Sequence, residues 1–157
     1  MEKYLELLEA AKKTFKTADH LAYMVYPLVK DIKLIVAITE NIYLTLANAL
    51  EAVVAYDLLY KRIPLVANDF DAKFKVFKEK CAPRYGIEKE SIDLIEELRN
   101  IIKSHENSRM EFVRQDKLII CSPTFKMKTL NIDTIKDYLT KTRKFLKKVE
   151  GIFKWVF

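Results

Sequence analysis

The stretch LIVAITENIYLTLANALEAVVAY, residues 34–56, decides the fold of this chain. Its apolar residues cover much of a helical circumference, which is typical of a helix buried at the centre of a bundle. Four polar side chains are spread along it: Glu40, Asn41, Asn48 and Glu51. A membrane span would leave these groups in hydrocarbon at high cost, so the stretch predicts a buried helix of a soluble protein and no membrane partner.

The composition around this stretch also favours helices. The chain has 157 residues, 50% of them hydrophobic, but only two glycines and four prolines. A sandwich or barrel needs many tight turns, so this scarcity of turn residues favours long helices. The length fits one domain, and no linker divides the chain, so we expect a single helical domain over residues 1–157.

Apolar periodicity and capping residues predict where the helices lie. The central helix should begin after Asp31 and continue to about residue 62. Before it, we expect a helix over residues 2–16 and a second that starts at Thr17 or Asp19 and ends or kinks at Pro27. The expected helices that follow the central one span residues 70–81, residues 88–105, and a terminal stretch that begins at Asn131 or Asp133.

One segment departs from the helical period. Residues 110–114 and 117–121 are rich in β-branched and aromatic types, and RQDK lies between them. This pattern predicts a small β-hairpin inserted between two helices near residues 110–121. The fold class we expect is therefore all-α, an up-and-down helical bundle with a small hairpin insertion.

The charge of the chain indicates which kinds of molecule it could bind. The net charge is +6, which favours anionic partners. The outer face of the terminal helix carries Lys136, Lys144, Lys147 and Lys148. These lysines form either a solvated face or a track for an RNA backbone.

Cys81 and Cys121 form no CxxC pair and have no histidine at metal spacing, so we expect reduced thiols, no metal, no cofactor and a cytoplasmic location.

The stretch LRNIIKSHENS, residues 98–108, holds the strongest chemical motif. At 100° per residue, His105 falls about 20° from the centre of the buried stripe and Arg99 lies on its rim, whereas Asn100 points nearly opposite. A plain alternative is a half-buried histidine at a helix C-terminus beside a rim arginine. The functional alternative is a small reaction centre in which an imidazole and a guanidinium act on a phosphate.

Arg99, Asn100 and His105, on the penultimate long helix of a bundle, resemble the HEPN superfamily signature, an arginine, commonly a polar residue, and a histidine four to six positions on. The similarity covers about residues 31–150 in architecture, with the N-terminal helices of residues 2–29 packed on that core. Residues 20–64 also resemble the front half of uncharacterised archaeal proteins of this kind. Abundant lysine, glutamate and isoleucine, with one glutamine, favour a thermophilic source.

The resemblance implies a homodimer that cleaves RNA without a metal ion. It implies that His105 transfers a proton, that Arg99 holds the phosphate oxygens, and that Asn100 orients the phosphate or the histidine. An acidic residue on a helix accompanies the motif in some members, and Glu40 and Glu51 are both candidates. Two other hypotheses stay open: a non-catalytic homodimer that binds nucleotide, RNA or a cognate partner protein, and a structural bundle in which the motif has no role.

Overall fold

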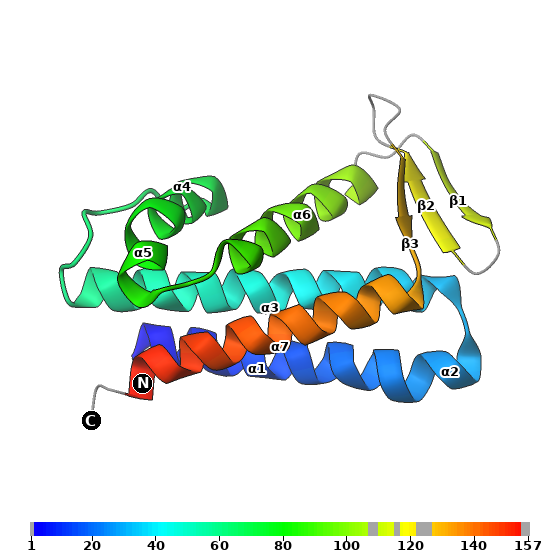
Figure 1. Cartoon of the computed structure of the whole chain (residues 1–157), viewed down its shortest axis with the longest axis horizontal. Coiled ribbons are helices and arrows are strands. Elements are labelled where there is room, and N and C mark those ends of the chain that lie inside the picture. The colour runs from blue at the N-terminus through cyan, green and yellow to red at the C-terminus, as the bar shows by residue number, and fades with distance from the viewer. Residues whose placement is uncertain (1, 107–109, 115–116, 122–126, 155–157) are drawn as a thin grey trace.

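The computed structural model describes residues 2–106, 110–114, 117–121 and 127–154. They form a bundle of long helices with a small sheet at one end (Figure 1). This arrangement confirms the helical bundle that the sequence predicts.

The first helical segment runs further than expected. Helix α1 (Lys3–His20), the π-helical turn η1 (Leu21–Val25) and helix α2 (Tyr26–Val29) follow one another directly. The predicted start of a second helix at Thr17 or Asp19 is therefore wrong. The Thr17 hydroxyl donates to the Lys13 carbonyl over 3.2 Å, as a residue inside a helix does. Pro27 lies in α2, and the helical segment ends two residues later, at Val29. The wider π turn before Pro27 accommodates a residue without an N–H group.

Helix α3 (Ile32–Leu59) is the centre of the bundle, as its sequence predicts. The Asp31 carboxylate caps its first turn by accepting a 2.9 Å hydrogen bond from the Lys33 N–H. Helices α1, α6 and α7 all pack against it. Among the described residues α3 alone has the length and hydropathy of a membrane span, and 56% of its most apolar window is buried in the protein.

A shorter helical segment follows α3. It consists of α4 (Phe70–Val76), the π-helical turn η2 (Phe77–Cys81) and α5 (Ala82–Tyr85). The Asp69 carboxylate caps α4 at 2.8 Å from the Ala72 nitrogen. The predicted end at residue 81 is wrong, because η2 accommodates Pro83 in the same way that η1 accommodates Pro27. The segment ends at Gly86, whose φ of 64° is the left-handed conformation that glycine adopts readily.

The last two long helices complete the bundle. Helix α6 (Lys89–Glu106) packs on α3 and α7, and α7 (Ile132–Phe153) packs on α3 and α1. Asn131 is the N-cap of α7, with its side-chain oxygen 2.9 Å from the Thr134 nitrogen. Residues of α7 that recur at spacings of three and four are buried against the bundle: Ile135, Leu139, Thr142, Leu146, Val149 and Phe153.

The segment between α6 and α7 differs from a two-stranded hairpin. Strands β1 (Met110–Arg114), β2 (Lys117–Cys121) and β3 (Met127–Leu130) form an antiparallel sheet in the order β1-β2-β3. Leu118, Ile120 and Leu130 are buried, and β2 contacts α6 and α3. The third strand was not predicted, because four residues next to a cap carry too little periodicity to indicate a strand.

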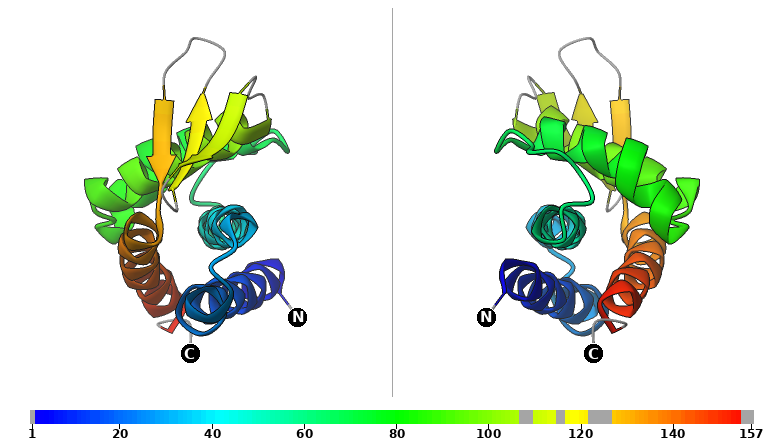
Figure 2. Two further views of the ribbon diagram at one scale, coloured as in Figure 1. Left: turned by 90° about the vertical axis from the view of Figure 1, so that its right-hand side faces the viewer. Right: turned by 90° about the vertical axis from the view of Figure 1, so that its left-hand side faces the viewer.

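One side of α3 is left uncovered. Seen end-on, α1 and α2, α7 and α6 surround three sides of α3, and much of the fourth side is left open (Figure 2). Helical spacing places Glu40, Leu44, Ala47 and Glu51 on that side. Helix α4 covers its far end, where Glu51 pairs with Lys73 at 3.6 Å. Glu40 and Leu44 are exposed there. We call these four residues the open face of α3.

Candidate functional site

Helix α6 places Arg99 and His105 beside α3. Its buried stripe consists of Leu94, Ile95, Leu98 and Ile101. Arg99 lies at the rim of this stripe and His105 lies in line with it at the C-terminal end of the helix, with 25% and 28% of their side chains exposed. Both side chains therefore reach α3 and still keep partial access to solvent.

The guanidinium of Arg99 contacts both α3 and α4. Its Nη1 donates a 2.8 Å hydrogen bond to the Tyr43 hydroxyl, and its Nη2 lies 3.5 Å from the Asp71 carboxylate. Its central carbon stands 4.6 Å from the centre of the Phe70 ring. The Nε atom is buried without a hydrogen-bond partner among the described residues. Since an unpaired buried donor costs free energy, an anion that reached this nitrogen would be bound favourably.

His105 lies one helical turn or more beyond Arg99 and meets a carboxylate of α3. Its Nε2 is 4.0 Å from Oε1 of Glu40. The cavity behind the imidazole is closed by apolar side chains of α3, α6 and the sheet, and it measures about 10 Å³. A cavity of this size holds about one water molecule, so a ligand could approach His105 only from the solvent side.

Asn100 does not belong to this arrangement. It lines a groove on another face of α6 together with Asp93, Glu96 and Glu97. Carboxylates on this face repel a phosphate. The expectation that Asn100 orients the phosphate or the histidine therefore has no geometric support within one chain.

The structure separates the two acidic candidates. Glu40 lies beside His105, whereas Glu51 forms an ion pair with Lys73 of α4 at 3.6 Å. Tyr43 of α3 also belongs to the site, because its hydroxyl accepts the hydrogen bond from Arg99. We call Glu40, Tyr43, Arg99 and His105 the α3–α6 seam.

The four lysines of α7 do not form one track. Lys136 lies 5.1 Å from the Tyr23 ring centre, near the start of the helix. Lys144 pairs with Glu88 at 3.2 Å. Lys147 and Lys148 form no ion pair with another described residue and line cavities on the surface of α7. The predicted lysines thus divide into one isolated residue and a group of three.

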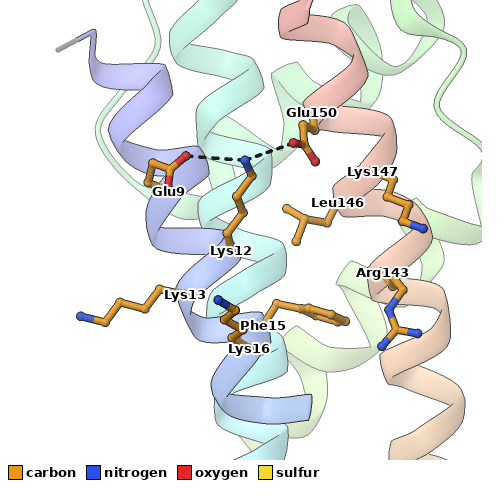
Figure 3. Close-up of a pocket in the computed structure, with 9 residues that line it drawn as sticks. All are labelled: Glu9, Lys12, Lys13, Phe15, Lys16, Arg143, Leu146, Lys147 and Glu150. Carbon is orange, nitrogen blue, oxygen red and sulfur yellow. Dashed lines mark ion pairs between the residues drawn. The ribbon is translucent and has the colours of Figure 1, made fainter. Parts of the chain in front are cut away.

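A basic groove lies between α1 and α7 (Figure 3). Its volume is about 770 Å³, with Phe15 and Leu146 as its apolar part. The cations around it are Lys12, Lys13, Lys16, Arg143 and Lys147. Two of them are already neutralised within the chain. Lys12 pairs with Glu150 at 3.1 Å, which raises its pKa, and Arg143 pairs with Asp19 at 3.0 Å.

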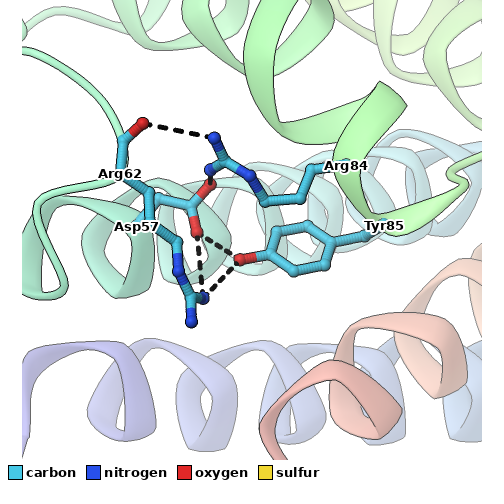
Figure 4. A network of polar contacts seen from close by, with 4 residues as sticks. All are labelled: Asp57, Arg62, Arg84 and Tyr85. Carbon is cyan, nitrogen blue, oxygen red and sulfur yellow. Dashed lines mark hydrogen bonds and ion pairs between the residues drawn. The ribbon is translucent and has the colours of Figure 1, made fainter.

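A second polar cluster joins the end of α3 to α5 (Figure 4). The fully buried carboxylate of Asp57 accepts hydrogen bonds from Arg84, at 2.8 Å, and from the Tyr85 hydroxyl. Arg62 donates to the Tyr85 hydroxyl over 3.0 Å and lies 3.8 Å from Asp57. Burial, followed by the hydrogen bond to Asp57, raises the pKa of Tyr85 to about 12, so this phenol stays neutral.

Cys81 lies next to this cluster. It is buried as a free thiol. Burial, with a smaller contribution from Asp57, raises its pKa to about 12. The Cys81 thiol is therefore a poor nucleophile in the folded protein. The side chain of Cys121 lies outside the described part of the structure.

The chemistry available at the α3–α6 seam is that of anion binding and proton transfer. A guanidinium can hold phosphate oxygens, and an imidazole beside a carboxylate can exchange a proton with a substrate. In the described part of the chain, no three His, Cys, Asp or Glu side chains lie close enough together to hold a metal ion. Comparison with known proteins places the chain in no family, since no family model, curated protein or solved structure matches it.

Proposed function

We propose that this chain is a HEPN-like protein that cleaves RNA without a metal ion, as a homodimer, through Arg99 and His105. The observation that carries the proposal is the α3–α6 seam. Two residues six positions apart on α6 both reach the same side of α3, and about a quarter of each side chain is exposed. RNA as substrate fits the basic charge of the chain and the predicted cytoplasmic location.

The chemistry requires one base and one acid. The RNA 2′-oxygen attacks the adjacent phosphorus, a base takes the 2′-hydroxyl proton, and an acid protonates the departing 5′-oxygen. The products are a 2′,3′-cyclic phosphate and a 5′-hydroxyl end. An imidazole fits both proton transfers near neutral pH, and a guanidinium fork stabilises the charge on the phosphorane oxygens.

One chain supplies one histidine to this seam, so we propose that the second comes from another copy. The open face of α3 borders the seam through Glu40, and Leu44 on that face is 47% exposed. A two-fold contact on this face would bring two seams together, because the same patch serves both partners. His105 of one copy would then act as the base, and His105 of the other as the acid.

The test is cleavage of a defined single-stranded RNA by the purified chain in EDTA, with the products analysed for cyclic phosphate ends. Arg99→Ala and His105→Ala should each reduce the cleavage rate about 100-fold or more. His20→Ala is the matched control, because it removes the other histidine of the chain from an exposed position on α1. The melting temperature of each variant reports whether it is folded.

Two results would contradict the proposal. One is cleavage that persists in both seam variants, which would assign it to a contaminant or another site. The other is activity that appears only when a divalent metal is added.

A non-catalytic homodimer of the same fold is the second candidate, and a specific observation favours it. Arg99 is already engaged by Tyr43, Phe70 and Asp71, and Asn100 lies on another face. Such a protein would bind nucleotide, RNA or a partner protein without cutting it. It should show no cleavage in EDTA, yet its melting temperature should rise with the ligand.

A further inference from the structure

Two adjoining cavities, where the end of α3 meets α5 and α7, are lined by a separate group of charged side chains. The larger, about 530 Å³, is lined by Tyr56, Arg62, Tyr85, Lys147, Lys148, Gly151 and Ile152. The smaller, about 260 Å³, shares Lys147 and Lys148 with it and adds Lys144 together with its ion-pair partner Glu88. We call these the tandem cavities. Tyr56 lies 13 residues beyond Tyr43 on α3, about 20 Å along the helix, so the tandem cavities are distinct from the α3–α6 seam.

Positive charge dominates the larger cavity. Arg62, Lys147 and Lys148 line it, and no described carboxylate does. Neither lysine forms an ion pair with another described residue, in contrast to Lys12 and Arg143 of the groove between α1 and α7. Asp57 lies 3.8 Å from Arg62 behind the cavity, so Lys147 and Lys148 are the lining cations without a described ion-pair partner. An anion in the cavity would reduce the repulsion between these positive charges.

The surrounding structure fixes one of these cations in place. Arg62 stands over the rings of Tyr56 and Tyr60, at 5.3 and 5.4 Å from their centres. It also donates to Tyr85, whose hydroxyl is held in turn by the buried Asp57 (Figure 4). A guanidinium held in this way binds an anion with little loss of side-chain entropy.

The two glycines of the chain provide a second, independent observation. One glycine lines each tandem cavity: Gly151 the larger and Gly86 the smaller. Gly86 is needed for its left-handed backbone, and a Cβ there would lie 3.9 Å from the Lys148 ammonium. Gly151 is different, because it lies inside α7, where glycine weakens a helix, and a Cβ there would meet nothing within 4 Å. No packing contact requires glycine at this position, but its absent side chain keeps the cavity open beside the helix backbone.

We propose that the tandem cavities bind a small ligand that carries two or more linked phosphates. Arg62, Lys147 and Lys148 hold the first phosphates in the larger cavity, and Lys144 lies along the continuation into the smaller one. The larger cavity, about 530 Å³, suits a small molecule, since ligand pockets commonly measure about 300–1,000 Å³. The inference does not depend on RNA cleavage, because none of these residues belongs to the α3–α6 seam.

The test is isothermal titration of the full chain with tripolyphosphate, pyrophosphate and inorganic phosphate at one ionic strength. We expect tripolyphosphate to bind most tightly. Lys148→Ala should weaken it about tenfold or more, because a charge-assisted contact is lost. Lys13→Ala is the matched control, since Lys13 carries the same charge but points away from the neighbouring side chains in Figure 3. A parallel titration with a nucleoside triphosphate distinguishes a nucleotide from an inorganic polyphosphate as the source of the linked phosphates.

Gly151→Leu distinguishes a loss of ligand binding from a loss of folding, because it should change the two in opposite directions. A leucine at this position fills the larger cavity and also replaces a glycine inside a helix, so the melting temperature should rise while tripolyphosphate binding falls at least tenfold. The proposal is overturned if Lys13→Ala weakens binding as much as Lys148→Ala does. It is also overturned if Gly151→Leu binds tripolyphosphate as the unchanged chain does, or if no polyphosphate binds more tightly than inorganic phosphate. RNA cleavage is measured separately, so either proposal can fail alone.

Discussion

At the scale of single residues, the buried carboxylate of Asp57 determines how the end of α3 joins α5. It is fully buried, and its hydrogen bonds to Arg84 and Tyr85 join positions 27 and 28 residues apart. A buried carboxylate is stable only when such partners compensate for its lost hydration. Asp57 therefore stabilises the protein only while both of these hydrogen bonds are present, because losing either partner leaves a buried charge without compensation.

We predict that Asp57→Asn lowers the free energy of unfolding by about 1–3 kcal/mol, because a charge-assisted acceptor is lost while Arg84 and Tyr85 remain. Thermal or urea unfolding measures the change. Asp137→Asn is the control, since its side chain is 60% exposed and, among the described residues, forms an ion pair with Lys141 alone; it should change stability by less than about 0.5 kcal/mol. Equal effects of the two substitutions would contradict this account of the cluster.

The sequence predicts residue-scale chemistry only where the partners share one helix. The spacing of Arg99 and His105 on α6 placed both near the buried stripe and Asn100 away from it, and the structure agrees. The partners of Arg99 and His105 on α3 could not be predicted, because Tyr43 is 56 positions from Arg99 in the chain. Contacts of this kind depend on how α3 and α6 pack, and periodicity carries no information on that.

At the scale of elements, N-capping residues predicted the helix boundaries better than prolines did. Asp31, Asp69 and Asn131 each begin a helix, as their side-chain oxygens predict. Pro27 and Pro83 mark the ends less sharply, since each lies inside a helical segment just after a π turn and the segment continues for two more residues. A proline ends a regular α-helix but fits one that has been widened locally, and no simple sequence pattern indicates such a turn.

The two glycines should respond oppositely to alanine. Gly151→Ala should raise the free energy of unfolding by about 0.5–1 kcal/mol, because alanine favours a helix interior and its methyl group meets open space. Gly86→Ala should lower the free energy of unfolding, because a φ of 64° is strained for alanine. Urea unfolding of both variants measures the two signs. Destabilisation by Gly151→Ala would mean that a contact excludes a side chain there.

At the scale of the whole molecule, the open face of α3 is where the proposed homodimer would form. The central helix of a bundle is normally covered on all sides, yet Leu44 of this one is 47% exposed. The α3–α6 seam borders this face, so association and catalysis are expected to be lost together.

Leu44→Glu should therefore convert the dimer to a monomer and reduce RNA cleavage at least tenfold, because two like charges would meet across the two-fold axis. Sedimentation or light scattering gives the mass. The control is Leu65→Glu, the same substitution at a leucine that is 96% exposed in the loop after α3. A Leu44→Glu protein that stays dimeric would exclude this face as the interface.

The π turn in the first helical segment has an effect beyond the proline that it accommodates. In a regular helix Val29 would lie about 20° around the axis from Ala18, on the inward side. One additional residue in η1 advances the helical phase by about 100°. Val29 is 59% exposed and its neighbour Leu28 is 86% exposed, whereas Ala18 and Ala22 are fully buried. The additional residue thus directs Leu28 and Val29 outward, as an apolar tip where the chain turns from α2 into α3. We expect contacts between molecules to form at this tip, and a one-residue deletion in η1 should turn the two side chains inward and remove these contacts.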